Sequence, residues 1–90
     1  MFAAVSTVEL PEGGTIEEGR KQLETEVIPM IKQAPGFVSA IFLSPPTGRE
    51  GLSIVVFETQ QQAQMAVDNM QTPPTVRVLT KEVREVAAKA

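Results

Sequence analysis

The side chains that could perform chemistry in this chain are few, because its 90 residues include no histidine and no cysteine. The commonest general base and every thiolate nucleophile are therefore absent, as are the usual nitrogen and sulfur ligands of metals. Ser6, Ser39 and Ser53 have no histidine to activate them, so we do not expect serine-type nucleophilic catalysis. We assign no catalytic, cofactor-binding or metal-binding residue, and we expect no cofactor.

The remaining polar candidates have simpler structural explanations. Glu17 with Glu18, and Glu24 with Glu26, are paired carboxylates that acid–base catalysis or a metal could use. Charged residues on a helix surface usually form its solvated face, however, and we assign these four to that role. Gly13-Gly14 precedes a predicted helix and could cradle an anion, but without a longer glycine pattern or a following lysine we interpret it as a turn.

Methionine and arginine side chains provide the other candidates for ligand binding. Met30, Met65 and Met70 could line an adaptable pocket, although methionines on apolar helix stripes more often fill the core. Arg49 and Arg77 are the best cations for an acidic ligand, but we expect both to face solvent. None of these residues is assigned a binding role.

Length and composition predict one domain that spans residues 1–90. No run approaches the roughly 18 apolar residues of a membrane span, and the start of the chain lacks the basic region of a secretory signal. We therefore expect a cytoplasmic protein without a membrane partner. The net charge of −3, with eight scattered Lys and Arg residues, argues against nucleic acid as a partner because phosphate contacts depend on cations.

The spacing of apolar residues predicts four strands and two helices. A long helix begins at the capping box of Thr15 and Glu18, and a short one begins at Thr59 and Gln62 and ends at Pro73 and Pro74. We expect a kink at Pro29, near the end of the long helix. The predicted strands cover residues 2–10, 37–43, 51–57 and 75–87, with strand favoured over helix for the last part of the fourth. This β-α-β-β-α-β order predicts an α+β, ferredoxin-like fold in which both helices cover one face of a four-stranded antiparallel sheet.

The third predicted strand is apolar on both sides. Leu52, Ile54 and Val56 point to one face of the sheet, whereas Val55 and Phe57 point to the other. The two helices can cover only one face, so the other requires a partner, most simply a second copy of the chain. We predict a homodimer whose interface contains Leu52, Ile54, Val56, Val76 and Val78.

The second predicted strand is apolar on both sides as well. Strict alternation places three of its apolar side chains on each face of the sheet. We expect Phe37, Ile41 and Leu43 on one face and Val38, Ala40 and Phe42 on the other.

The segment from Glu50 to Phe57 resembles the third strand of the RNA-recognition motif, but its functional positions differ. Leu52 and Ile54 stand where that motif has base-stacking rings, and Glu50 stands where it has a cation. Aliphatic side chains cannot replace stacking worth about 1–3 kcal/mol per base, and an acidic residue repels phosphate. The motif therefore predicts no binding of nucleic acid.

The chain is also similar to the dimeric α/β-barrel superfamily, in particular to the antibiotic biosynthesis monooxygenases. The similarity rests on three segments. They are the late proline of the long first helix (Glu26–Ile31), the connection from that helix to the second strand (Ala34–Phe37) and the terminal strand (Val83–Ala87). It implies that two sheets pack face to face in a dimer. The enzymes of that superfamily are cofactor-independent oxygenases or haem-degrading enzymes that use Trp, Tyr, His and Asn between helices and sheet. This chain has none of the first three and a single asparagine, Asn69, so no catalytic role is transferred.

The sequence therefore predicts a homodimeric α/β-barrel that binds a small apolar molecule between sheet and helices, and it does not name a reaction. Two alternatives stay open. One is a cofactor-independent, monooxygenase-like enzyme that acts on a reactive aromatic substrate. The other is a protein-interaction module that uses the open face of the sheet.

Overall fold

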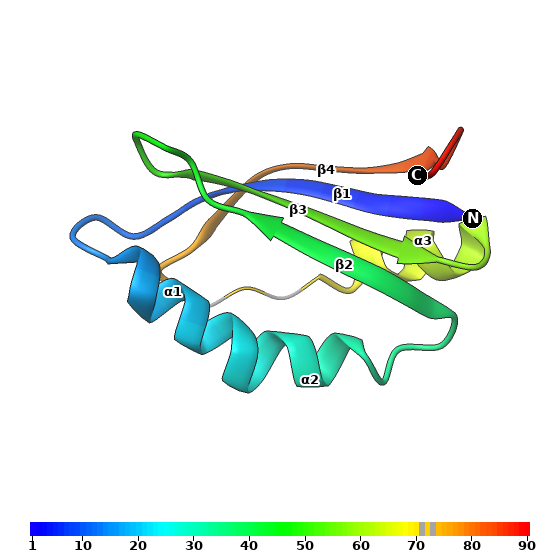
Figure 1. Cartoon of the computed structure of the whole chain (residues 1–90), viewed down its shortest axis with the longest axis horizontal. Coiled ribbons are helices and arrows are strands. Elements are labelled where there is room, and N and C mark those ends of the chain that lie inside the picture. Colours follow the sequence, from blue (N-terminus) through cyan, green and yellow to red (C-terminus); the bar gives the residue numbers. More distant parts are fainter. Residues whose placement is uncertain (71, 73) are drawn as a thin grey trace.

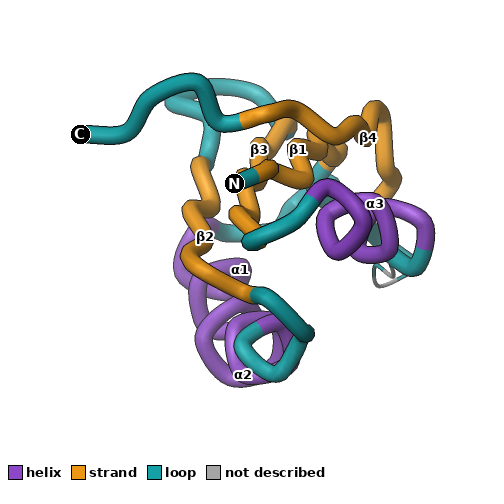
Figure 2. The backbone as a smooth tube through the Cα atoms, turned by 90° about the vertical axis from the view of Figure 1, so that its right-hand side faces the viewer, coloured by secondary structure: helices purple, strands orange, loops and turns teal. Residues whose placement is uncertain are grey.

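The computed structural model describes residues 1–70, 72 and 74–90. Its strands β1 (Phe2–Glu9), β2 (Phe37–Leu43), β3 (Glu50–Phe57) and β4 (Arg77–Glu85) form one antiparallel sheet in the order β2-β3-β1-β4. The helical elements are α1 (Ile16–Gln22), η1 (Leu23–Val27), α2 (Ile28–Ile31) and α3 (Gln60–Asp68). Figures 1 and 2 show the helices on one side of the sheet, while the other side is open. The predicted ferredoxin-like α+β fold is confirmed.

The long first helix is continuous but contains a widened turn. Thr15 caps its start, where Thr15 Oγ1 accepts a hydrogen bond from the backbone N–H of Glu18 at 3.1 Å. Pro29 has no N–H to donate to the carbonyl of Thr25. The segment just before the proline, η1, is a π-helical turn in which the N–H of Ile28 bonds to the carbonyl of Leu23. The sequence predicts a disturbance at Pro29, and the structure shows that it takes the form of a π-turn.

The second helix, α3, has the predicted start and an earlier end. Thr59 and Gln62 form both hydrogen bonds of the capping box, each at 3.2 Å. The helix ends at Asp68 with Asn69 as its C-cap, ahead of the prolines that we expected to end it. Pro73 lies outside the described residues, and Pro74 lies in a turn.

Strand β2 contains an irregularity that the alternation of its residues does not predict. Phe37 pairs with Phe57, and Ser39 pairs with Val56, so Val38 is an extra residue in the ladder. Such a bulge inverts the phase of the side chains on one side of it. The prediction that Phe37 shares a face with Ile41 is therefore wrong, because Phe37 lies with Phe57 on the helix side.

The buried core is small, and most of it lies between α3 and the sheet. Phe57 of β3 is 2% exposed, and Ala63 and Val67 of α3 are buried with it. In contrast, α1, η1 and α2 contain no buried residue. The apolar stripe of the first helix is therefore not packed into this core, and Figure 2 shows that helix at a distance from α3 beneath the sheet.

Candidate ligand-binding site

A cavity of about 270 Å³ lies between the first helix, the end of α3 and the helix side of the sheet. The first helix lines it with Val27, Met30 and Ile31, and Ala34 lines it from the segment that follows the helix. The sheet contributes Ala4, Ser6, Phe42, Ser53, Val55 and Phe57, and the end of α3 contributes Ala66, Val67, Asn69 and Met70. The lining is therefore mostly aliphatic and aromatic.

Three polar side chains interrupt this apolar lining. Ser6 of β1 stands opposite Ser53 of β3, and their hydroxyl oxygens are 2.5 Å apart, so one hydroxyl donates to the other. Asn69 at the end of α3 donates from Nδ2 to the carbonyl of Met65 at 2.9 Å. A few placed polar groups in an apolar cavity are typical of small-molecule sites.

The lining of the cavity is uncharged over the part of the chain that the structure describes. Among the residues that the structure describes, the cavity has no Asp, Glu, Lys or Arg in its lining. Over the same ranges, no group of three or more acidic side chains is arranged to hold a metal ion. The arrangement therefore favours neutral, mainly apolar ligands.

The carboxylates that the sequence singled out are on the surface. Glu17, Glu18, Glu24 and Glu26 are all exposed, which confirms their assignment to the solvated face of the helix. The glycine pair next to them is part of a turn, closed by a hydrogen bond of 3.2 Å from the N–H of Gly14 to the carbonyl of Pro11.

The two arginines also lie away from the cavity. Arg49 forms an ion pair with Glu9 at 3.9 Å, and Arg77 stands exposed at the position opposite Glu9 on β4. Exposed pairs of this kind contribute at most about 1 kcal/mol. The expectation that both arginines face solvent is confirmed.

The methionines differ from the expectation that they fill the core. Met30 and Met70 line the cavity, although Met30 is 57% exposed and therefore also borders solvent. Met65 is 55% exposed and does not line the cavity. Helical spacing identified the apolar stripe correctly, but it does not reveal whether the space in front of the stripe is filled.

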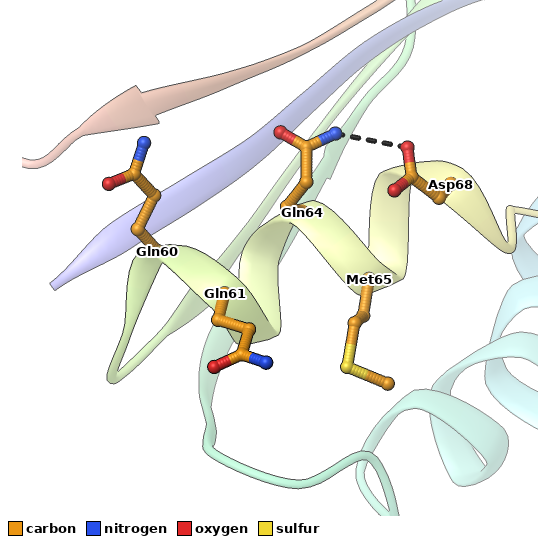
Figure 3. A pocket seen from close by; sticks show the side chains of 5 residues that line it. All are labelled: Gln60, Gln61, Gln64, Met65 and Asp68. Carbon is orange, nitrogen blue, oxygen red and sulfur yellow. Dashed lines mark hydrogen bonds between the residues drawn. The ribbon is translucent and has the colours of Figure 1, made fainter.

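A second hollow lies on the outer surface of α3 and is a weaker candidate. Figure 3 shows the side chains that line it, where Gln64 Nε2 donates to Asp68 Oδ1 at 3.0 Å. Its other lining residues are Gln60, Gln61 and Met65, and all five are exposed. A shallow, exposed, polar hollow provides little apolar area for a ligand.

The side of the sheet away from the helices presents an apolar surface. Leu52, Ile54 and Val56 of β3 share this surface, as the sequence predicts, because the residues that alternate with them in β3 line the cavity on the helix side. Ile41 and Leu43 of β2 are 55% and 48% exposed there. We call the surface formed by Val5, Ile41, Leu43, Leu52, Ile54 and Val56 the open face.

Val76 and Val78 are not part of the open face. In β4, Thr80 pairs with Thr7 but Val78 pairs with Val8, so Leu79 is an extra residue. The bulge moves Val78 to the helix side of the sheet. Val76 precedes β4 and accepts a hydrogen bond at its carbonyl from Thr72 Oγ1 at 3.1 Å. On β4, the open face instead carries Thr80, Glu82 and Arg84.

Comparison with solved structures identifies the fold. The chain is similar to the heme-degrader MhuD from Mycobacterium tuberculosis, whose structure has two hemes bound in its active site. The TM-score is 0.72 over 100% of this chain and 99% of that chain, at 14% sequence identity. The fold is that of MhuD. No protein-family model and no curated protein matches the sequence. The resemblance that the sequence indicates is confirmed at the level of the fold.

The cavity lining does not fit the heme that MhuD binds. Heme iron is held by histidine, cysteine or tyrosine, or by methionine together with histidine. This chain contains no histidine, cysteine or tyrosine. Among the described residues, the lining also has no cation to pair with the carboxylates of heme.

The helices of the described ranges are too short or too polar to cross a membrane.

Sequence reasoning missed two features of the site, the serine pair and Asn69. Serine chemistry suggests only a nucleophile for Ser6 and Ser53, although each interrupts the apolar side of its strand that faces the helices. That interruption is a signal in the sequence, but their pairing depends on the register of β1 and β3.

Proposed function

We propose that this chain is a homodimeric barrel protein that binds a small, mainly apolar molecule in the cavity between the first helix and the sheet. The observation that supports it is the unfilled apolar surface of that helix. Protein interiors are normally packed as densely as organic crystals. Here an apolar stripe and an apolar sheet face enclose about 270 Å³ instead of meeting.

The size of the cavity supports a small ligand. Sites for drug-sized molecules measure about 300–1,000 Å³. A cavity of about 270 Å³ lies just below that range and suits a compact molecule of one or two rings. The neutral lining supports binding in preference to acid–base catalysis, which needs a titratable group within reach of the substrate.

Dimerisation and ligand binding would use opposite sides of the sheet. The cavity lies on the helix side, and the half-exposed Ile41 and Leu43 lie on the open face. Contiguous exposed apolar patches mark interaction sites. A second copy packed on the open face would cover it without closing the cavity, so each subunit would keep its own site.

A variant that fills the cavity tests the binding site. Ala66 lines the cavity from α3, and Ala66→Phe would place a ring in that space. We expect the wild-type protein to bind N-phenyl-1-naphthylamine, a neutral dye that fluoresces in apolar surroundings, and the variant to lose at least about tenfold in affinity, or 1.4 kcal/mol. The measurement is a fluorescence titration, which benefits from the absence of Trp and Tyr in the chain.

The matched control is Ala87→Phe, which adds the same ring at an exposed position after β4. It should bind the dye as the wild type does. Ala34→Phe fills the cavity from the opposite wall and should repeat the loss, so the result does not depend on one variant. Equal dye affinity in the wild type, Ala66→Phe and Ala34→Phe, with unchanged melting temperatures, would show that the dye binds elsewhere.

A further inference from the structure

The serine pair of the cavity is an unusual polar feature at a buried position. Ser6 is 5% exposed, and it stands opposite Ser53 on the neighbouring strand. The residues before and after them on the same side of the sheet are apolar, with Ala4 on β1 and Val55 on β3. A hydroxyl costs free energy on burial unless it forms hydrogen bonds. Two alanines at these positions would line the cavity without that cost.

The serine pair has one O–H group left to donate to a ligand. Each serine has one O–H group that donates and lone pairs that accept. Within the pair, one hydroxyl donates its proton to the other across 2.5 Å. The accepting hydroxyl keeps a proton, and its oxygen forms no other side-chain hydrogen bond among the described residues. Because that hydroxyl already accepts a hydrogen bond, it becomes a better donor through polarisation.

We propose that the Ser6–Ser53 pair is the polar anchor of the cavity and selects compact apolar molecules that carry an oxygen acceptor, such as a ketone or an alcohol. This inference rests on the proposed function, because it assigns the ligand class of the same cavity. The ligand oxygen accepts the free O–H of the pair. Its hydrocarbon body contacts the apolar lining, including Phe42, Val55 and Phe57.

A second hydroxyl pair in the sheet provides a comparison. Thr7 and Thr80 also stand opposite each other on neighbouring strands, with hydroxyl oxygens 2.6 Å apart. They lie on the open face, and neither lines the cavity. Removing a hydroxyl from this pair changes the sheet in a similar way but leaves the ligand site intact.

The test uses camphane, camphor and borneol, which share one carbon skeleton and differ only in oxygen. Their affinities are measured by displacement of the dye from the wild type, from the double variant Ser6→Ala/Ser53→Ala and from the control Thr80→Val. We expect the preference for camphor over camphane to fall about threefold to tenfold in the double variant, or about 0.7–1.4 kcal/mol, because one net hydrogen bond to the ligand is lost. Borneol, which both accepts and donates, should lose affinity in the same way.

Camphane affinity should not fall in the double variant, and Thr80→Val should keep the wild-type preference. The single variant Ser53→Ala should lose part of the preference for camphor over camphane, since the hydroxyl of Ser6 still has a proton to donate. This variant tests the proposal if the double variant does not fold. If camphane and camphor bind the wild type but the ratio of their affinities is unchanged in the serine variants, the serine pair is not the polar anchor, while the cavity remains a binding site. If none of the three compounds displaces the dye from the wild type, the proposed ligand site and the anchor are both wrong.

Discussion

Ile54→Glu is expected to convert the homodimer into a monomer or an aggregate. Ile54 lies in the middle of the open face, where it pairs with Val5 of β1 and Ile41 of β2. In the proposed dimer this position is covered by the partner, and burying an unpaired carboxylate there costs several kcal/mol. Sedimentation velocity at micromolar concentration measures the change.

The control for this variant is Ile16→Glu. Ile16 is an apolar residue that is 58% exposed at the start of the first helix, away from the sheet. The same chemical change there should leave the dimer intact. A wild-type protein that sediments as a monomer, together with an Ile54→Glu variant that keeps the wild-type melting temperature, would refute the homodimer.

Phe57→Ala is expected to produce the largest loss of folding stability. Phe57 is the most buried large side chain of the described residues, at 2% exposure, and it lies against the buried face of α3. Removing a buried phenylalanine costs about 3–5 kcal/mol through lost burial and the cavity that remains. Natural domains are stable by only about 5–15 kcal/mol, so the variant should be partly unfolded at moderate temperature.

Urea unfolding followed by circular dichroism measures this loss, at one protein concentration because dimer stability depends on concentration. Phe42→Ala is the control, since Phe42 borders the cavity as Phe57 does but is only half-buried. It should cost clearly less free energy of unfolding. Equal losses for the two variants would mean that the core does not lie where we place it.

The order and kind of the elements could be predicted from the sequence because local signals agree there. Thr15 and Thr59 stand at helix starts, and both accept the expected backbone hydrogen bonds. Strand alternation also placed Leu52, Ile54 and Val56 on one face correctly. Each of these signals depends on neighbours within a few residues, which the sequence displays directly.

The errors in the predicted faces come from two β-bulges. Val38 and Leu79 are extra residues in the ladders, and each inverts the phase of the residues beyond it. For this reason Phe37 and Val78 lie on the helix side. Val and Leu are ordinary strand residues, so nothing in their types marks a bulge.

The cavity could not be predicted for a different reason. Helical periodicity shows that Val27, Met30 and Ile31 face inward, and it gives no information on how closely the sheet approaches them. The approach depends on where the first helix lies relative to α3, which is set by tertiary packing. Small side chains at Ala4, Ala34 and Ala66 leave space that larger residues would fill.

The most direct test of the ligand site uses the methyl groups of the four methionines as reporters. Met30 and Met70 line the cavity, whereas Met65 lies on the outer surface of α3 and Met1 is exposed at the start of the chain. The measurement is a titration of isotope-labelled methionine methyl groups with camphor by NMR, with each signal assigned from a Met→Leu variant. We predict saturable shifts at Met30 and Met70 and unchanged signals at Met65 and Met1. Shifts at Met65 or Met1 without shifts at Met30 and Met70, or no shifts at all, would contradict a binding site between the first helix and the sheet.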